Sequence, residues 1–209
     1  MGLKERKARE KQARRRQIID AARSLLFEKG LQATSINQIA KRAELAVGTI
    51  YFYYASKEEL FAELQEEGLQ LLMEKVRQAT STVDDPKERL RAMAMAYYDF
   101  SQDHKDYFDI ISYFLSSPNI LLSADLKQRV DQRMEKILEI INATFARGLD
   151  AGTFGEYAQE SRGVLVLAAF HGLMQFRKFE TTVFKGVSHR DLYSSAVGQL
   201  LDGLAQTSS

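Results

Sequence analysis

The sequence of 209 residues predicts an all-α protein of about nine helices, with three short N-terminal helices followed by a larger helical part. Apolar residues recur at helical spacing along nearly the whole chain, capping patterns begin several of these runs, and no alternating run is long enough to require a sheet. Basic charge gathers at one end: residues 1–60 hold 13 Lys and Arg against 7 Asp and Glu, and residues 61–209 hold 16 against 21. This asymmetry indicates an N-terminal segment that meets a polyanion, although a solvated basic tail would look the same.

Composition excludes several classes of protein. The absence of cysteine rules out disulfides and thiolate metal sites. The first sixteen residues, MGLKERKAREKQARRR, lack the apolar region of a secretory signal. The most apolar run, residues 163–174, has 12 residues, well short of the roughly 20 that span a bilayer. We therefore expect a cytoplasmic protein without membrane contact.

The sequence does not predict an enzyme. Its three histidines, His104, His171 and His189, are scattered, and it has no HExxH pattern, no nucleotide-binding glycine pattern and no serine elbow. The glycines of residues 148–155 follow no predicted strand, so a phosphate loop is not expected there. No catalytic residue, cofactor or metal is predicted.

The N-terminal helices are predicted from their starts and stops. The first runs from about Arg14 to Gly30, which is placed for a left-handed C-cap. The second begins at Ser35, the first residue of a capping box, and a turn over residues 43–48 separates it from a short third helix. Ser56 begins another capping box and a long fourth helix.

Five further helices are predicted in the rest of the chain. The first of them starts with Asp85 as N-cap and Pro86 at the first helical position. Three glycines predict an exposed loop over residues 148–155, after the third of the five. Their expected spans are about 86–104, 107–115, 124–149, 159–181 and 188–205.

Four consecutive aromatic residues, Tyr51–Tyr54, lie in the third helix. Successive residues turn about 100° around a helix, so the four rings cannot share one buried face. Ile50 and Tyr54 are expected to pack inward, and the outward face to consist of Gly48, Thr49, Phe52 and Tyr53. Short helices joined by a tight turn describe a helix-turn-helix, about residues 36–55, whose last helix enters the major groove of DNA.

Cationic residues stand at two predicted helix starts. Lys57 lies in the first turn of the fourth helix, where the positive end of the dipole disfavours a cation unless an outside anion compensates. The same argument applies to Arg14–Arg16 at the predicted start of the first helix. We expect both helix starts to clamp phosphates.

Residues 34–61, TSINQIAKRAELAVGTIYFYYASKEELF, resemble the DNA-binding domain of the TetR family of ligand-responsive transcriptional regulators. The shared features are the Thr34-Ser35 cap, the Ile39-Ala40 pair, GTIY at 48–51 and KEEL at 57–60. The resemblance covers about residues 17–64. It implies a basic arm (1–16), a helix-turn-helix DNA-binding domain (17–64) and a helical domain for effector binding and dimerisation (65–209).

The resemblance also implies roles for individual residues. Expected phosphate contacts are Thr34 or Ser35, Tyr51, Tyr53 and Lys57, and the expected base-facing residues are Ala46, Val47, Thr49 and Phe52, beside the open backbone of Gly48. Glu44 stands where the family usually has glycine, which should matter little if the turn is not left-handed there. Ala46 and Val47 replace more polar residues, so base readout is expected to be mostly apolar, with DNA shape contributing.

The last two helices are expected to form a dimer, as the resemblance implies. The helix from about Gln159 is apolar on nearly every side, which is typical of half of an intermolecular four-helix bundle, with an internal core helix as the alternative. A two-fold dimer would read a palindromic operator. The predicted interface residues are Val164, Leu167, Ala168, Val197, Leu200, Leu201 and Leu204.

An effector pocket for a small lipophilic or aromatic molecule is predicted in the C-terminal domain, although residues of these types, taken one at a time, are more often plain core. The candidate lining residues are Met93, Tyr97, Phe100, Tyr107, Phe108, Ile111, Phe114, Met134, Ile137, Ile141, Phe145, Phe170, His171 and Met174. The resulting hypothesis is a dimeric repressor that its effector releases from the operator. The alternative is a DNA-bound organiser that a protein partner controls without a small effector.

Overall fold

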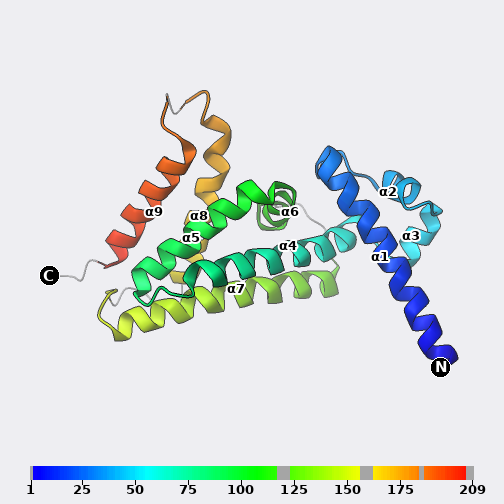
Figure 1. Ribbon diagram of the computed structural model, residues 1–209, viewed down its shortest axis with the longest axis horizontal. Helices are drawn as coiled ribbons and strands as arrows, with labels where there is room; N and C mark the ends of the chain where they lie inside the picture. Colours follow the sequence, from blue (N-terminus) through cyan, green and yellow to red (C-terminus); the bar gives the residue numbers. More distant parts are fainter. Residues whose placement is uncertain (1, 117–122, 156–161, 184–185, 206–209) are drawn as a thin grey trace. The chain divides into compact units, whose positions relative to one another are not determined.

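Every regular element of the described chain is a helix. The computed structural model describes residues 2–116, 123–155, 162–183 and 186–205 (Figure 1). Within these ranges there are nine α-helices, one 3-10 helix and no strand, so the all-α prediction is confirmed. The helices are α1 (Leu3–Lys29), α2 (Ile36–Arg42), α3 (Val47–Tyr53), α4 (Lys57–Thr80), α5 (Pro86–Asp103), α6 (Lys105–Ser116), α7 (Ala124–Asp150), α8 (Arg162–Gln175), η2 (Phe176–Phe179) and α9 (His189–Ala205).

The predicted capping residues begin and end these helices. Gly30 ends α1 with a φ of 77°. The Ser35 hydroxyl accepts a hydrogen bond from the Gln38 N–H at 3.4 Å, and the Gln38 side chain accepts one from the Ser35 N–H at 3.0 Å. Ser56 and Asp85 accept hydrogen bonds of 3.1 Å and 2.8 Å from the N–H groups three residues later. Local sequence therefore determines these ends.

Two predicted helix boundaries are wrong. The first helix begins at Leu3 rather than near Arg14, because residues 3–16 consist almost entirely of strong helix formers. The α8 helix ends at Gln175 and continues only as the 3-10 turn η2, whereas the sequence predicts helix to about 181. The predicted start of this helix near Gln159 lies outside the described residues. None of the described helices combines the length and apolar character needed to cross a membrane.

The helices divide into two compact units. The first contains residues 1–69 and 104–130, and the second contains residues 70–103 and 131–209. Helices α4 and α7 therefore contribute residues to both units. This division by packing places α6 with the helix-turn-helix helices; the functional boundary at residues 64 and 65 stays a prediction.

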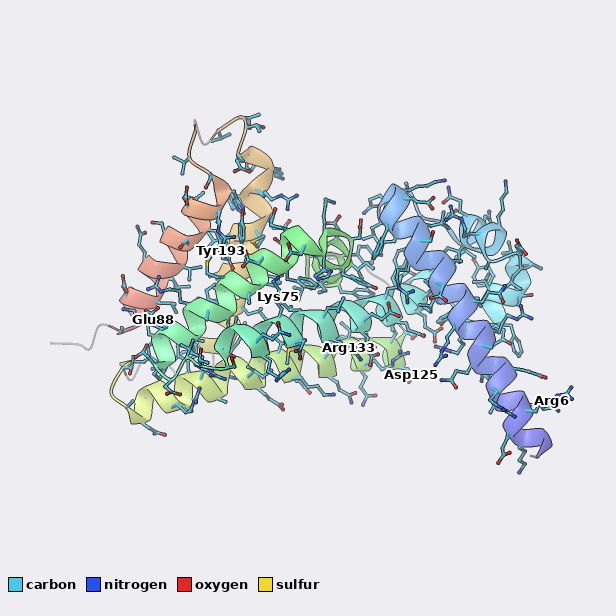
Figure 2. All side chains as sticks on the ribbon, viewed as in Figure 1. Arg6, Lys75, Glu88, Asp125, Arg133 and Tyr193 are labelled. Carbon is cyan, nitrogen blue, oxygen red and sulfur yellow. The ribbon has the colours of Figure 1, made fainter. Side chains whose placement is uncertain are left out.

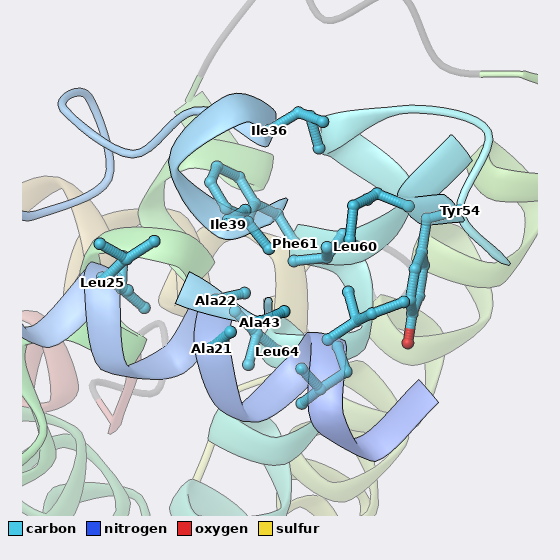
Figure 3. Packing of buried hydrophobic residues seen from close by; sticks show 14 of the residues in the cluster. Ala21, Ala22, Leu25, Ile36, Ile39, Ala43, Tyr54, Leu60, Phe61 and Leu64 are labelled. Carbon is cyan, nitrogen blue, oxygen red and sulfur yellow. The ribbon is translucent and has the colours of Figure 1, made fainter. Parts of the chain in front are cut away.

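The hydrophobic core of the first unit contains residues of α1, α2, α3 and α4, together with Ile110 of α6 (Figure 3). Ile18, Ile39, Ile50 and Leu60 are each 0% exposed. Burial of one such side chain contributes about 1.5–3 kcal/mol, so the cluster fixes α3 firmly through one of its faces. The opposite face of α3 is left for another partner.

Ion pairs and one tight helix contact surround this core. Arg15 and Arg23 of α1 pair with Glu63 and Glu67 of α4, the second pair at 2.7 Å. The Tyr107 hydroxyl of α6 donates to Glu67 at 3.0 Å. A Cβ on Gly68 would lie 2.9 Å from the Tyr107 Cβ, so α6 contacts α4 closely at the glycine.

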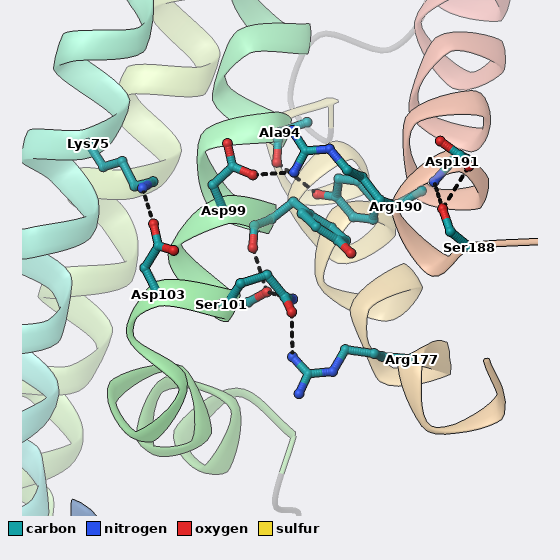
Figure 4. Close-up of polar contacts among 12 residues, drawn as sticks. Lys75, Ala94, Asp99, Ser101, Asp103, Arg177, Ser188, Arg190 and Asp191 are labelled. Atoms are coloured by element: carbon teal, nitrogen blue, oxygen red, sulfur yellow. Dashed lines mark hydrogen bonds and ion pairs between the residues drawn. The ribbon is translucent and has the colours of Figure 1, made fainter. Parts of the chain in front are cut away.

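In the second unit α9 packs against α5 (Figure 4). Tyr193 is 0% exposed, and its hydroxyl donates to the Ala94 carbonyl oxygen at 3.2 Å. Arg190 of α9 also pairs with Asp99 of α5. At the end of α5, Asp103 accepts from Lys75 of α4 at 2.6 Å. The contacts of Tyr193 and Arg190 fix one face of α9 inside its own chain.

The turn after α7 folds back onto the helix. Gly148 lies within α7 and is buried, and a Cβ there would be 2.3 Å from the Phe154 ring. The Phe154 ring is 4% exposed and lies 5.0 Å from the Phe145 ring. The prediction of an exposed loop is therefore wrong at Gly148 and Phe154, because the glycine makes room for an aromatic ring. Residues 156–161 lie outside the described ranges.

Candidate nucleic-acid interface

The turn before α3 is a left-handed helix end. The N–H of Leu45 donates to the Ala40 carbonyl oxygen at 2.9 Å, and the N–H of Glu44 donates to the Lys41 carbonyl oxygen at 3.2 Å. These two bonds are those of a Schellman motif, in which the residue after the C-cap takes the left-handed conformation and is usually glycine. Glu44 takes it with a φ of 54°. The turn is therefore left-handed at Glu44, so the condition under which the replacement of glycine would matter little is not met, and the residue carries backbone strain.

Helix α3 has one anchored face and one exposed face. Ile50 and Tyr54 are each 0% exposed, as the helical spacing predicts. Phe52 is 78% exposed and Tyr51 is 52% exposed. Large exposed aromatic rings on a rigid helix indicate a surface that meets another molecule. Of the predicted base-facing residues, Ala46 and Val47 are exposed, as is the backbone of Gly48, and Thr49 is half-buried.

Arg15 fastens the C-terminal end of α3 to the bundle. Its guanidinium donates to the Tyr53 carbonyl oxygen at 3.4 Å, pairs with Glu63 and lies 4.5 Å from the centre of the Tyr54 ring. Burial, with the Glu63 carboxylate as a further cause, raises the pKa of Tyr54. The Tyr54 hydroxyl therefore stays protonated and donates to Glu63 at 3.0 Å.

Arg14–Arg16 do not start a helix, contrary to the prediction. They lie in the middle of α1, where Arg15 pairs with Glu63 and Arg14 donates to Gln17 at 2.7 Å. The dipole argument for a phosphate clamp at these residues is therefore wrong. Sequence reasoning failed here because the preceding residues extend the helix.

Lys57 is the first residue of α4, as predicted, and it is half-buried. Its Nζ atom lies 4.9 Å from the centre of the Phe61 ring. Burial lowers the pKa of Lys57, and no carboxylate forms an ion pair with it within the part of the chain that the structure describes. A phosphate would supply this anion at the start of α4, where the positive end of the helix dipole lies.

The two hydroxyl residues before α2 differ from each other. Thr34 is 1% exposed, and its hydroxyl donates to the Gly30 carbonyl oxygen at 2.8 Å. Ser35 is exposed. The Ser35 hydroxyl also donates within the chain, to Gln38 Oε1 at 3.1 Å. Its exposure, rather than an unused hydrogen, makes Ser35 the better placed of the two for a phosphate oxygen.

The predicted effector residues are divided between the two units. Tyr107, Phe108, Ile111 and Phe114 belong to the first unit, and the others belong to the second. The Tyr107 ring meets the Phe27 ring edge-on at 5.4 Å, so it packs α6 against α1. Those of the second unit are buried (Met93, Tyr97, Phe100, Ile141, Phe145, Phe170, His171 and Met174) or half-buried (Met134 and Ile137).

One polar cluster connects two of these residues in the second unit. The Tyr97 hydroxyl and His171 Nδ1 are 2.8 Å apart, and Gln175 Nε2 is 3.2 Å from His171 Nε2. Burial lowers the pKa of His171, which favours the neutral ring. A neutral imidazole has one donor and one acceptor nitrogen, which matches two polar neighbours.

The predicted dimer interface divides into exposed and buried residues. Val164 is 54% exposed and Ala168 is also exposed. Val197 and Leu201 are each 0% exposed within their own chain, so their assignment to the interface is wrong. They face the core because α9 packs against α5. Leu167, Leu200 and Leu204 are half-buried.

Sequence reasoning missed the Arg15–Glu63 pair and the exposure of Leu165, which is 52%. No sequence signal indicates that pair, because its residues are 48 positions apart. Leu165 was detectable, since it follows Val164 in an almost wholly apolar helix. The glycine that the family usually has at position 44 was the signal for the left-handed turn.

Together, the buttressed third helix and its exposed aromatic face define a DNA-binding protein of the helix-turn-helix class. Residues 18–64 match the family model of "Bacterial regulatory proteins, tetR family". These residues therefore form a DNA-binding domain of the kind found in transcriptional regulators of the TetR family, as the resemblance implies.

Individual relatives agree with this assignment. The "fatty acid metabolism regulator protein" of Bacillus subtilis is 24% identical over 148 residues, which are 71% of this chain and 74% of the relative. The "HTH-type transcriptional regulator BetI" of Yersinia pestis is 40% identical over 91 residues, which are 43% of this chain and 46% of the relative. The fold is similar to that of the transcriptional regulator FadR from Bacillus subtilis, solved in complex with stearoyl-CoA. The TM-score is 0.68 at 21% identity, over 90% of this chain and 97% of FadR.

Proposed function

We propose that the protein is a dimeric repressor that binds a palindromic operator through α3 and leaves it when an acyl-chain effector binds. The observation that carries the DNA-binding part is the contrast across α3, where Phe52 is 78% exposed and Ile50 is 0% exposed. A helix held rigidly through one face presents the other face in a defined register, as groove recognition requires.

The proposed contacts divide into positioning and reading. Ser35, Tyr51, Tyr53 and Lys57 donate to phosphates and fix the register of the helix on the duplex. The bases are contacted by Val47, Thr49 and Phe52, whose methyl groups and ring can pack against the methyl group of thymine. The small residues Ala46 and Gly48 allow the helix to approach the bases closely. Because this face of α3 is mostly apolar, it forms few hydrogen bonds with the bases. The stiffness of the operator DNA and the width of its grooves therefore contribute to specificity.

A second copy of the chain is the proposed partner of α8. Val164 and Leu165 expose more than half of their surfaces on neighbouring positions, and Ala168 continues this face one turn later. An apolar helix face of this kind is stabilised when another chain covers it. A two-fold dimer then places two α3 helices on half-sites about 34 Å apart, one turn of the duplex.

The proposed effector is a fatty acyl chain carried as a thioester or an acid. Supporting this class are the aromatic and methionine side chains of the second unit, the relative named for fatty acid metabolism, and the FadR complex with stearoyl-CoA. Release follows if the effector prefers the conformation with low DNA affinity, and the loss of affinity equals that preference. In the alternative function, a protein partner takes the place of the effector.

Selection of bound duplexes from a random pool tests the proposal. We expect one enriched palindrome, tighter binding of it by the wild type than by Phe52→Ala, and little change for Phe176→Ala, which truncates another phenylalanine that is 53% exposed. Stearoyl-CoA should then release the selected duplex, whereas free coenzyme A should not. Lack of any enriched sequence would sink the DNA-binding proposal. Enrichment without release by stearoyl-CoA or stearate would favour control by a protein partner.

A further inference from the structure

The first helix continues far beyond the core that it stabilises. Its first deeply buried side chain is Ile18, so residues 3–17 precede the core as about four turns of helix. In Figure 1 the dark-blue N-terminal turns of α1 run on past α2 and α3. Residues 3–16 hold eight Lys and Arg against two Glu. This segment is called the basic extension below.

The cations of the basic extension form a stripe in line with the buried face of α1. At about 100° per residue, the stripe residues Lys4, Lys7, Lys11 and Arg14 fall within a sector of about 80°. Residues 18, 22 and 25, which are buried, fall within the same sector. One continuous face of α1 is therefore apolar where the helix packs in the bundle and cationic in the basic extension.

The stripe has no anionic partner inside the described chain. The ion pairs of the extension involve two other arginines, Arg6 with Glu10 at 3.0 Å and Arg15 with Glu63. All four stripe residues are exposed. Cations three and four positions apart repel each other on a helix, so an external anion would stabilise this face.

The stripe begins beside the end of the recognition helix. Lys11 is one turn before Arg15, whose guanidinium donates to Tyr53, the last residue of α3. A groove of about 630 Å³ runs along this part of α1, lined by Lys11, Arg15 and Arg16 on one side and Glu63 on the other. Figure 2 shows Arg6 near the free end of the same helix. The extension spans about 20 Å, the length of about six base pairs.

We infer that Lys4, Lys7, Lys11 and Arg14 bind backbone phosphates of duplex DNA beyond the half-site that α3 reads. This inference rests on the proposed DNA-binding function and lengthens the recognised tract by several base pairs on each outer side. An anionic lipid surface is a poorer partner, because the opposite face of the extension carries Arg9, Ala13 and Arg16 instead of large apolar side chains.

Two matched variants of the full chain distinguish a specific role of the stripe residues from a general effect of positive charge. The stripe variant is Lys4→Gln, Lys7→Gln and Lys11→Gln, and the control is Arg6→Gln, Arg9→Gln and Arg16→Gln. Both remove three charges from exposed positions and introduce a residue that forms helix well. Circular dichroism and thermal melts establish that both are folded.

Salt-dependent binding and hydroxyl-radical footprints on the selected operator measure the effect. For each bound protomer the stripe variant should reduce the slope of log affinity against log salt by about 2.7, or about 0.9 per lost phosphate contact. Its footprint should lose the outer flank and keep the central half-sites. The control should lower the slope by less than half as much and keep the whole footprint.

Several results would overturn the inference. Equal slopes and footprints for the two variants would show that only net charge matters. Full binding with an unchanged flank would remove the inference and leave the proposed function intact. Failure of the wild type to bind any duplex at low salt would remove both. Loss of binding to phosphatidylserine vesicles by the stripe variant, with an unchanged footprint, would assign the stripe to membranes instead.

Discussion

Tyr54 and Glu63 join the end of α3 to α4: the Tyr54 hydroxyl donates to Glu63 Oε2 at 3.0 Å, and the whole tyrosine is 0% exposed. Arg15 reaches the same carboxylate from α1 and lies over the ring. One carboxylate therefore links three helices around the recognition helix. The orientation of the exposed face of α3 depends on this small polar cluster.

Tyr54→Phe should lower the free energy of unfolding by about 1 kcal/mol, because one hydrogen bond is lost while Glu63 keeps its arginine. Tyr54→Ala should cost about 3–5 kcal/mol, because it empties the space of a buried ring. Urea denaturation measures both. Equal losses for the two variants would show that the hydroxyl, and not the ring, determines the stability of this site.

Glu44→Gly should raise the free energy of unfolding by about 1 kcal/mol, because glycine adopts the left-handed conformation without the steric cost of a Cβ. Lys41→Gly, three residues earlier and inside α2, should instead lower it by about 1 kcal/mol. Thermal melts of both variants check the signs. A less stable Glu44→Gly protein would contradict the assigned turn.

Lys57→Ala should weaken binding to all duplexes by a similar factor and reduce the salt slope by about one for each half-site. The reason is that the lost contact is to phosphate, which carries no sequence information. Lys29→Ala, at an exposed lysine in the last turn of α1, is the control and should leave the slope unchanged. Fluorescence anisotropy at several salt concentrations measures both, and an unaltered slope for Lys57→Ala would exclude a phosphate contact.

Leu165→Asp should give a folded monomer, because the residue is 52% exposed in one chain and would place a carboxylate in the dimer interface. An unpaired buried charge costs several kcal/mol, and two-fold symmetry applies this cost twice. Val183→Asp, at a residue 59% exposed, should leave the oligomeric state unchanged. Sedimentation equilibrium distinguishes the outcomes. An intact Leu165→Asp dimer would move the interface to another surface.

Stability should decrease as the pH falls through the range in which unfolded histidine takes up a proton, around 6.5. Burial lowers the pKa of His171 in the folded protein, so at these pH values the unfolded state binds more protons. The loss is at most about 1.4 kcal/mol per pH unit and ends once the pH is below the folded pKa. Urea denaturation between pH 7.5 and about 5 should show a flatter profile for His171→Gln than for the wild type, and identical profiles would contradict this origin.

The sequence alone was sufficient for the fold class, the helix caps, the inward positions of Ile50 and Tyr54, and the family. These features depend on residues near each other in the chain: a hydroxyl three positions before an N–H group, or two side chains one helical turn apart. Local geometry is encoded by local spacing, so it can be read without tertiary coordinates.

Only the tertiary structure decided which surfaces stay open. In the structure, Val197 and Leu201 are buried where α9 packs against α5, and Tyr107 packs against α1 and α4. Arg15 pairs with Glu63, which lies 48 positions later in the chain. Helical spacing predicts that a residue is apolar and on a given face, but not which neighbour covers that face. Long-range packing makes that choice, and here it left the aromatic face of α3 and the basic stripe of α1 exposed.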